Sequence, residues 1–231
     1  MTPAQVLDDP AGECAKRLAE AVAAGGHIVL TGGSTPKACY ERLAAMDLDW
    51  SGATLWFSDE RCVPPDDELS NYGMARKALL DRLPKIADGG PAVKRIAGER
   101  GPGAAADDYE RELRETLGEE LPRLDLVLLG LGPDAHVASL FPGQSSLNVQ
   151  DRLAVGVEEA GMEPYVPRVS LTLPVLNAAR SVVFLVSGAD KAEAVARAFA
   201  GEPTPDAPGS LVRPHDGELT VLLDHAAAAN L

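Results

Sequence analysis

His136 and Asp134 are the residues of this chain best suited to acid–base chemistry. Both follow the apolar segment 124–129, separated from it by a turn that contains Gly130 and Gly132. An imidazole has an unperturbed pKa of about 6.5, so near neutral pH it can take a proton from water. We expect His136 to act as a general base, with Asp134 or a backbone group holding its ring in one tautomer. A purely structural histidine is the alternative.

A second stretch that could bind a ligand is Gly32-Gly33-Ser34-Thr35, directly after the apolar segment 27–30. Glycines let the backbone approach a ligand closely, and hydroxyl groups and the start of a helix supply donors. This combination is typical of phosphate binding. The stretch is not a Walker loop, because no Gly-Lys-Ser/Thr follows it, and a capped turn between strand and helix is the alternative.

The third stretch places three adjacent charged residues, Asp59, Glu60 and Arg61, after the apolar segment 53–57. We expect Asp59 and Arg61 to contact a polar substrate, although a surface salt bridge would explain any one of the three equally well.

A dinucleotide site is a competing interpretation of the histidine stretch. Gly130, Gly132 and Ala135 fit the spacing of that motif, and Glu158 ends a later apolar segment. The motif requires a helix of several turns directly after it, whereas Phe141-Pro142-Gly143 would stop a helix within about two turns. A nicotinamide enzyme is therefore disfavoured.

The elements that must position these stretches alternate between strands and helices. We predict an α/β fold in a single domain over residues 1–231, a mostly parallel open sheet with helices on both faces. Sites in such folds lie beyond the carboxyl ends of the strands. A helix should start at Pro36, capped by Ser34 or Thr35, and another should be capped by Ser70. The predicted strands are 27–30, 53–57, 93–96, 124–129, 153–157, 181–186 and 219–223, and the predicted helices 11–24, 70–83, 103–117 and 189–200, with a weak helix at 226–230.

Composition narrows the choice of partners and location. The net charge of −14, from 21 basic and 35 acidic residues, disfavours nucleic acid and anionic membranes as partners. The beginning of the chain lacks the pattern of a signal peptide. The odd number of cysteines, three, indicates free thiols in a reducing cytoplasm.

Taken together, the motifs resemble the 6-phosphogluconolactonase family, within the glucosamine-6-phosphate deaminase-like fold. The matching pieces run in order from residue 32 to residue 195: GGSTP at 32–36, SDERCVP at 58–64 with SN at 70–71, GLGPDAHVASLFPG at 130–143, RVSLTLPVLNAA at 168–179 and SGADKAEAV at 187–195. Two positions depart from the family pattern, which usually has Gly at Ala135 and commonly Thr at Val137.

The resemblance implies hydrolysis of 6-phosphogluconolactone to 6-phosphogluconate, which is the second step of the oxidative pentose phosphate pathway. It also implies a cytoplasmic enzyme that is a monomer or a small homo-oligomer. It implies no metal and no organic cofactor. By similarity to the sibling deaminases, Arg168 and Lys191 should close around the substrate's phosphate. Backbone N–H groups around 130–135, or Arg61, could stabilise the oxyanion.

Two rival functions are weaker. The sibling deaminases continue their histidine motif into Phe-Asn-Glu-Pro, whereas this chain has Ser139-Leu140-Phe141-Pro142 and so lacks that carboxylate. A sugar-phosphate sensor would usually carry a DNA-binding module, for which neither end has the length or the basic charge.

Ala135 carries a further prediction. Left-handed backbone geometry costs a residue other than glycine about 1–2 kcal/mol. We therefore expect Ala135 to have a negative φ and to begin a short helix, with His136 in its first turn.

Overall fold

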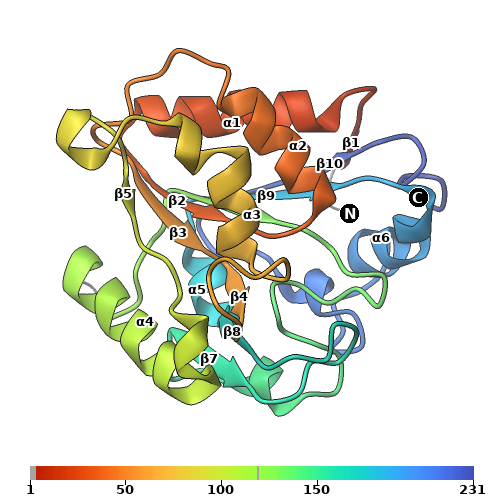
Figure 1. The fold of residues 1–231 in the computed structure, drawn as a ribbon. Helices are drawn as coiled ribbons and strands as arrows, with labels where there is room; N and C mark the ends of the chain where they lie inside the picture. Colours follow the sequence, from red (N-terminus) through yellow and green to blue (C-terminus); the bar gives the residue numbers. More distant parts are fainter. Residues whose placement is uncertain (1–3, 119) are drawn as a thin grey trace.

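The computed structural model describes residues 4–118 and 120–231, and within them the main sheet has seven strands (Figure 1). Their spatial order is β1-β10-β9-β6-β2-β3-β5, and all neighbouring pairs are parallel. The bounds are Ala4–Val6 (β1), His27–Leu30 (β2), Thr54–Phe57 (β3), Ala92–Val93 (β5), Leu126–Leu129 (β6), Ser181–Val186 (β9) and Glu218–Leu223 (β10).

The order of the strands reverses between β2 and β6. From β2 the sheet grows through β3 to β5, and from β6 it grows the other way through β9 to β10. Connections that leave two such strands run in opposite directions, so they open a crevice at the carboxyl ends of the strands. The glycine-rich stretches after β2 and β6 both lie there.

Helices cover both faces of this sheet, as predicted. Figure 1 shows α1 and α2 above the sheet and α4 and α5 below it. The helix α1 begins where the Asp9 carboxylate accepts a hydrogen bond from the Gly12 N–H at 3.0 Å. The helices are Pro10–Ala23 (α1), Ser34–Leu43 (α2), Asn71–Ala78 (α3), Pro102–Leu117 (α4), Leu173–Ala178 (α5) and Ala192–Phe199 (α6).

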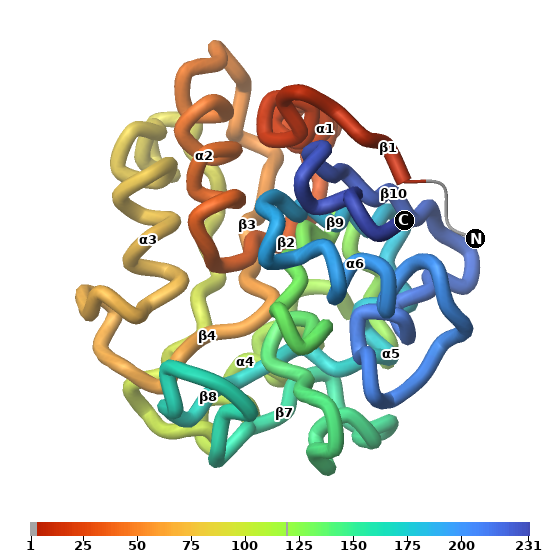
Figure 2. The backbone as a smooth tube through the Cα atoms, turned by 90° about the vertical axis from the view of Figure 1, so that its right-hand side faces the viewer, coloured from red at the N-terminus to blue at the C-terminus, as the bar shows by residue number. Residues whose placement is uncertain are grey.

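A second, smaller sheet was not predicted. It joins Asp59–Arg61 (β4), Arg168–Leu171 (β8) and Ala154–Val157 (β7) in antiparallel pairs, and α4 packs against β7 and β8. Figure 2 shows these three strands close together below the main sheet. The segment that follows β3 is therefore a strand, and its charged residues are fixed by pairing with β8.

Some predicted helix ends were wrong. The α2 helix starts at Ser34 and has no side-chain cap, because Gly33, with a φ of 112°, turns the chain directly into the helix. Ser70 does cap α3, but this helix stops at Ala78 because Leu79, with a φ of −131°, leaves the helical region. The helix predicted over 189–200 is a 3₁₀ turn followed by α6, and residues 226–230 form turns.

One hydrophobic cluster runs through both sheets, with Trp56 and Tyr109 among its largest fully buried side chains. Across residues 4–118 and 120–231, no helix is long and apolar enough to cross a membrane.

Candidate active site

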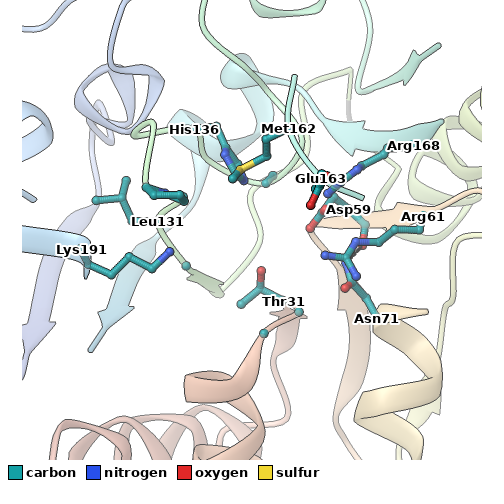
Figure 3. Close-up of a pocket in the computed structure, with 16 residues that line it drawn as sticks. Thr31, Asp59, Arg61, Asn71, Leu131, His136, Met162, Glu163, Arg168 and Lys191 are labelled. Carbon is teal, nitrogen blue, oxygen red and sulfur yellow. Dashed lines mark hydrogen bonds between the residues drawn. The ribbon is translucent and has the colours of Figure 1, made fainter. Parts of the chain in front are cut away.

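A cavity of about 280 Å³ lies at the carboxyl ends of β2 and β6 (Figure 3). The main sheet contributes the turns after these two strands, and the small sheet contributes side chains from β4 and β8. Its lining residues are Thr31, Gly32, Gly33, Asp59, Arg61, Asn71, Gly130, Leu131, Gly132, Pro133, His136, Ala138, Met162, Glu163, Arg168 and Lys191. The described residues contain no group of three or more His, Cys, Asp or Glu side chains that could hold a metal ion.

Asp134 holds His136 in a defined orientation. Its Oδ1 lies 2.6 Å from His136 Nδ1 and also accepts the His136 backbone N–H at 3.1 Å. Burial alone would raise the pKa of Asp134, but hydrogen bonding to His136 outweighs it and lowers that pKa. An ionised Asp134 favours the tautomer with the proton on Nδ1, so Nε2 is left as an acceptor of protons.

Glycine is required at position 132. A Cβ atom there would lie 2.0 Å from His136 Nδ1, so only glycine leaves room for the imidazole beside the turn.

The prediction for Ala135 was wrong. Its φ is +67°, and Ala138 also has a positive φ, of 49°. Here the turn folds back on itself, because the Gly132 N–H donates to the His136 carbonyl and the Ala135 N–H donates to the Gly132 carbonyl. The Gly209 N–H donates to the Ala135 carbonyl at 2.9 Å. These hydrogen bonds hold Ala135 in the left-handed conformation, and the residue does not begin a helix. The long helix that a dinucleotide site would require after this turn is therefore absent.

Phe141 lies between the histidine and a buried arginine. Its ring centroid is 4.5 Å from that of His136, and the Arg168 guanidinium carbon lies 5.4 Å from the same centroid. The buried ring does not line the cavity itself but packs against two side chains that do.

Successive side chains of the strand β4 point to opposite faces of the small sheet. Asp59 and Arg61 therefore line the cavity, and Glu60, between them, does not. Asp59 is buried, and its two carboxylate oxygens accept the hydroxyls of Ser58 at 2.8 Å and Ser139 at 2.7 Å.

Glu60 instead accepts hydrogen bonds from its own strand and from the start of α3. Its Oε1 accepts the backbone N–H groups of Arg61 at 2.7 Å and Asn71 at 2.8 Å. Its Oε2 accepts the Tyr72 N–H at 2.8 Å and the Ser70 hydroxyl at 3.0 Å. The carboxylate thus ties β4 to the first turn of α3, where a negative charge is favourable.

Arg61 and Arg168 face each other across the paired strands β4 and β8. Arg168 is only 2% exposed. Burial, and then the charge of Arg61, lower its pKa. Each donates one hydrogen bond to a carbonyl, Arg61 to Leu69 and Arg168 to Pro164, and the Nε of each has no partner among the described residues. Two guanidiniums with free donors suit an anion or a developing oxyanion.

The turn after β2 is held rigidly. The Tyr40 hydroxyl accepts the Thr31 N–H and donates to the Thr31 carbonyl, both at 2.8 Å. A Cβ at Gly32 would lie 2.0 Å from the Asn71 side chain, so glycine is required there too.

Ser34 and Thr35 line an adjoining cavity of about 130 Å³, which shares Gly32, Gly33 and Lys191 with the first. In Figure 3, Lys191 approaches from one side of the pocket and Arg168 from the opposite side. Lys191 lines both cavities, whereas Arg168 lines only the first, together with Gly32 and Gly33.

Several lining residues were not identified as site residues from the sequence. Asn71 and Ala138 lie within the recognised motifs, so their membership of a motif could have identified them. Met162 and Glu163 lie in an irregular segment between β7 and β8, and no pattern in the sequence indicates them.

Comparison with known proteins finds similarity to one protein family. A family model described as glucosamine-6-phosphate isomerases/6-phosphogluconolactonase matches residues 1–221. A 6-phosphogluconolactonase of Nostoc sp. is 44% identical over 211 residues, which cover 88% of this chain and 84% of the relative. The human 6-phosphogluconolactonase is 42% identical over 176 residues, which cover 76% of this chain and 67% of the relative.

Solved structures agree with these similarities. The 6-phosphogluconolactonase from Trypanosoma cruzi matches with a TM-score of 0.86 at 31% identity, covering 100% of this chain and 97% of the other. A monomeric glucosamine-6-phosphate deaminase, at 21% identity and a TM-score of 0.82, covers 100% of both chains and shares the fold.

Proposed function

The chain belongs to the glucosamine-6-phosphate isomerase/6-phosphogluconolactonase family, and we propose that it hydrolyses 6-phosphogluconolactone to 6-phosphogluconate through a water molecule that His136 activates. This is the second step of the oxidative pentose phosphate pathway. The observation that carries the proposal is the 2.6 Å contact between Asp134 and His136 Nδ1, which leaves Nε2 for the substrate side of the cavity.

The reaction needs one proton acceptor and one site for negative charge. Nε2 of His136 takes a proton as water attacks the lactone carbonyl carbon, and the carbonyl oxygen becomes an oxyanion. The bond between that carbon and the ring oxygen then breaks, and the proton on Nε2 passes to the departing ring oxygen. The products are a carboxylic acid, which ionises, and a free hydroxyl group. Asp134 stabilises the transient imidazolium without itself taking the proton.

Arg61 is the better supported oxyanion donor. The backbone N–H groups of Gly132 and Ala135 already donate within their own turn, whereas Arg61 lines the cavity and, among the described residues, its guanidinium donates only from Nη1, to the Leu69 carbonyl. A charged donor in a partly buried site can contribute several kcal/mol to the transition state, on the order of 2.7–4 kcal/mol for one donor.

We assign the substrate's phosphate to Gly32, Gly33, Ser34, Thr35 and Lys191. The start of α2 presents backbone N–H groups there, and Lys191, which follows the carboxyl end of β9, supplies a positive charge. Arg168, on the far side of the cavity, would then face the lactone end together with Asp59 and Arg61.

The lactonase branch fits the structure better than the deaminase branch. After the histidine this chain offers the Ser139 hydroxyl, which is committed to Asp59, and no carboxylate follows in that turn. We further propose a single domain over 1–231 in the cytoplasm, a monomer or small homo-oligomer that acts on a small-molecule substrate without nucleic acid or membrane partners.

The decisive experiment follows the decay of freshly generated 6-phosphogluconolactone with and without the purified protein, with the spontaneous rate subtracted. His136→Asn should abolish the acceleration. His225→Asn is a matched control, because His225 is highly exposed and, among the described residues, its side chain is paired only with Asp8. Glucosamine 6-phosphate tests the sibling reaction in parallel, and turnover of that compound alone would overturn the proposal.

A further inference from the structure

Glu163 places a second carboxylate, after that of Asp59, in the wall of a cavity that also carries three cationic side chains, those of Arg61, Arg168 and Lys191. It belongs to the strap, residues 158–167, which joins β7 to β8 and passes over the pocket. Figure 3 shows the Glu163 carboxylate directed into the cavity, on the side of Asp59 and Arg168 and away from Lys191.

The strap is anchored on both sides of Glu163. Before it, Met162 packs against the small cluster of Phe141, Val157 and Ala160. After it, the Pro164 carbonyl accepts a hydrogen bond from Arg168 Nη2 at 3.0 Å, and the Pro167 carbonyl accepts the Cys62 N–H at 2.8 Å. The backbone of Glu163 is therefore held over the pocket, and its charge stays near the same wall.

The two carboxylates of the pocket differ in their bonding. Asp59 is buried and saturated by two hydroxyl groups. Glu163 is exposed and forms no hydrogen bond or ion pair with any residue in 4–118 or 120–231. Glu163 forms no ion pair with Arg168, so its negative charge can interact with a ligand bound beside Arg61 and Arg168.

We propose that Glu163 discriminates between substrate and product by repelling the carboxylate that hydrolysis creates. This rests on the proposed function and its orientation of the substrate. The lactone carries charge only on its phosphate, whereas the product carries an additional negative charge on the carbon that was the carbonyl. That charge appears at the end of the cavity where Arg61 and Arg168 would otherwise retain it. Glu163 opposes this retention and speeds product release.

The test is calorimetric binding to wild type and Glu163→Gln, with two stable ligands. These are 6-phosphogluconate and sorbitol 6-phosphate, which replaces the carboxylate by a hydroxymethyl group. A unit charge a few ångströms away in a water-accessible pocket changes affinity by roughly three- to tenfold. Glu163→Gln should bind 6-phosphogluconate tighter by that factor and sorbitol 6-phosphate within about twofold of wild type. Glu159→Gln, a change to an exposed strap carboxylate outside this cavity, should alter neither affinity.

Unchanged affinity for 6-phosphogluconate in Glu163→Gln would overturn the inference. Equal tightening of both ligands would overturn it as well, because Glu163 would then act on the phosphate. Since binding is measured without turnover, the outcome is separate from the lactonase assay: a wild type that fails to accelerate lactone decay overturns the proposed function instead.

Discussion

Replacing Glu60 by glutamine should destabilise the fold while leaving the chemistry intact. Glu60 accepts four hydrogen bonds, three of them from backbone N–H groups, and does not line the cavity. An amide can keep one oxygen in place of Oε1. Its nitrogen then faces the Tyr72 N–H, which loses its partner, while the Ser70 hydroxyl can rotate to accept.

The magnitude follows from these contacts. An unpartnered buried N–H costs about 1–3 kcal/mol, and each remaining bond weakens because its acceptor is no longer charged. Burial raises the pKa of Glu60, so ionisation of this group has a cost in the folded state that a neutral amide avoids. The net loss in the free energy of unfolding should be about 2–4 kcal/mol. For a chain of this length that lowers the melting temperature by roughly 5–15 °C.

The assay compares thermal unfolding of wild type, Glu60→Gln and the exposed-site control Glu68→Gln, followed by lactonase rates well below each midpoint. We expect Glu68→Gln to match wild type in both measurements and Glu60→Gln to retain kcat within about threefold. A midpoint within 2 °C of wild type, on the order of a 1 kcal/mol change or less, would refute the assigned hydrogen bonds. A kcat reduced by tenfold or more (about 1.4 kcal/mol) at unchanged stability would place Glu60 in the reaction.

Four further outcomes are expected. His136→Asn should lower kcat by roughly 10²–10⁴-fold with little change in KM, and initial rates within threefold of wild type would remove it from the mechanism. Lys191→Ala should weaken 6-phosphogluconate binding by about tenfold or more in calorimetry, and an unchanged affinity would place the phosphate elsewhere. Hydrogen bonds to His136 outweigh burial and keep the pKa of Asp134 below its ordinary value of 3.8. In acid titrations of stability, the advantage of wild type over Asp134→Asn should therefore persist above that pH and disappear as the pH falls below it; an advantage unaffected by acid would contradict this. Ala135→Gly should change the free energy of unfolding by less than about 1 kcal/mol, because relief of left-handed strain offsets the lost buried methyl group, and a loss above 2 kcal/mol in denaturant unfolding would show that packing dominates.

Six of the seven strands of the main sheet could be predicted, because they are short apolar runs with turns and helices between them. The edge strand β1 was missed, because it has only three residues and none of them is buried. The same pattern predicted the position of the candidate site, since the glycine-rich stretches that line the cavity come directly after β2 and β6. The small sheet could not be predicted, because Asp59–Arg61 and Arg168–Leu171 are short, and three of their residues are buried charges. Their strand character depends on antiparallel pairing between segments far apart in the chain.

Residues of the candidate site could be predicted where they belong to one sequence motif, and not where tertiary contacts bring them to the cavity. His136 and Asp134 are brought together by their own turn, whereas Glu163 reaches the cavity because the strap is anchored at Met162 and Pro164. Ala135 shows the limit of a local rule. A cost of about 1–2 kcal/mol was expected to exclude a positive φ, but three backbone hydrogen bonds around the turn compensate for it.

Phe141 has a consequence for anyone who redesigns this enzyme. One aromatic ring contacts both His136 and Arg168, so the proposed catalytic base and the guanidinium cannot be repositioned independently. A library that varies Phe141 would change reactivity and anion preference at once, and its results would be hard to separate. The Lys191 side of the cavity has no such shared ring contact among the described residues, so changes of substrate length or of the terminal anion are better sought there.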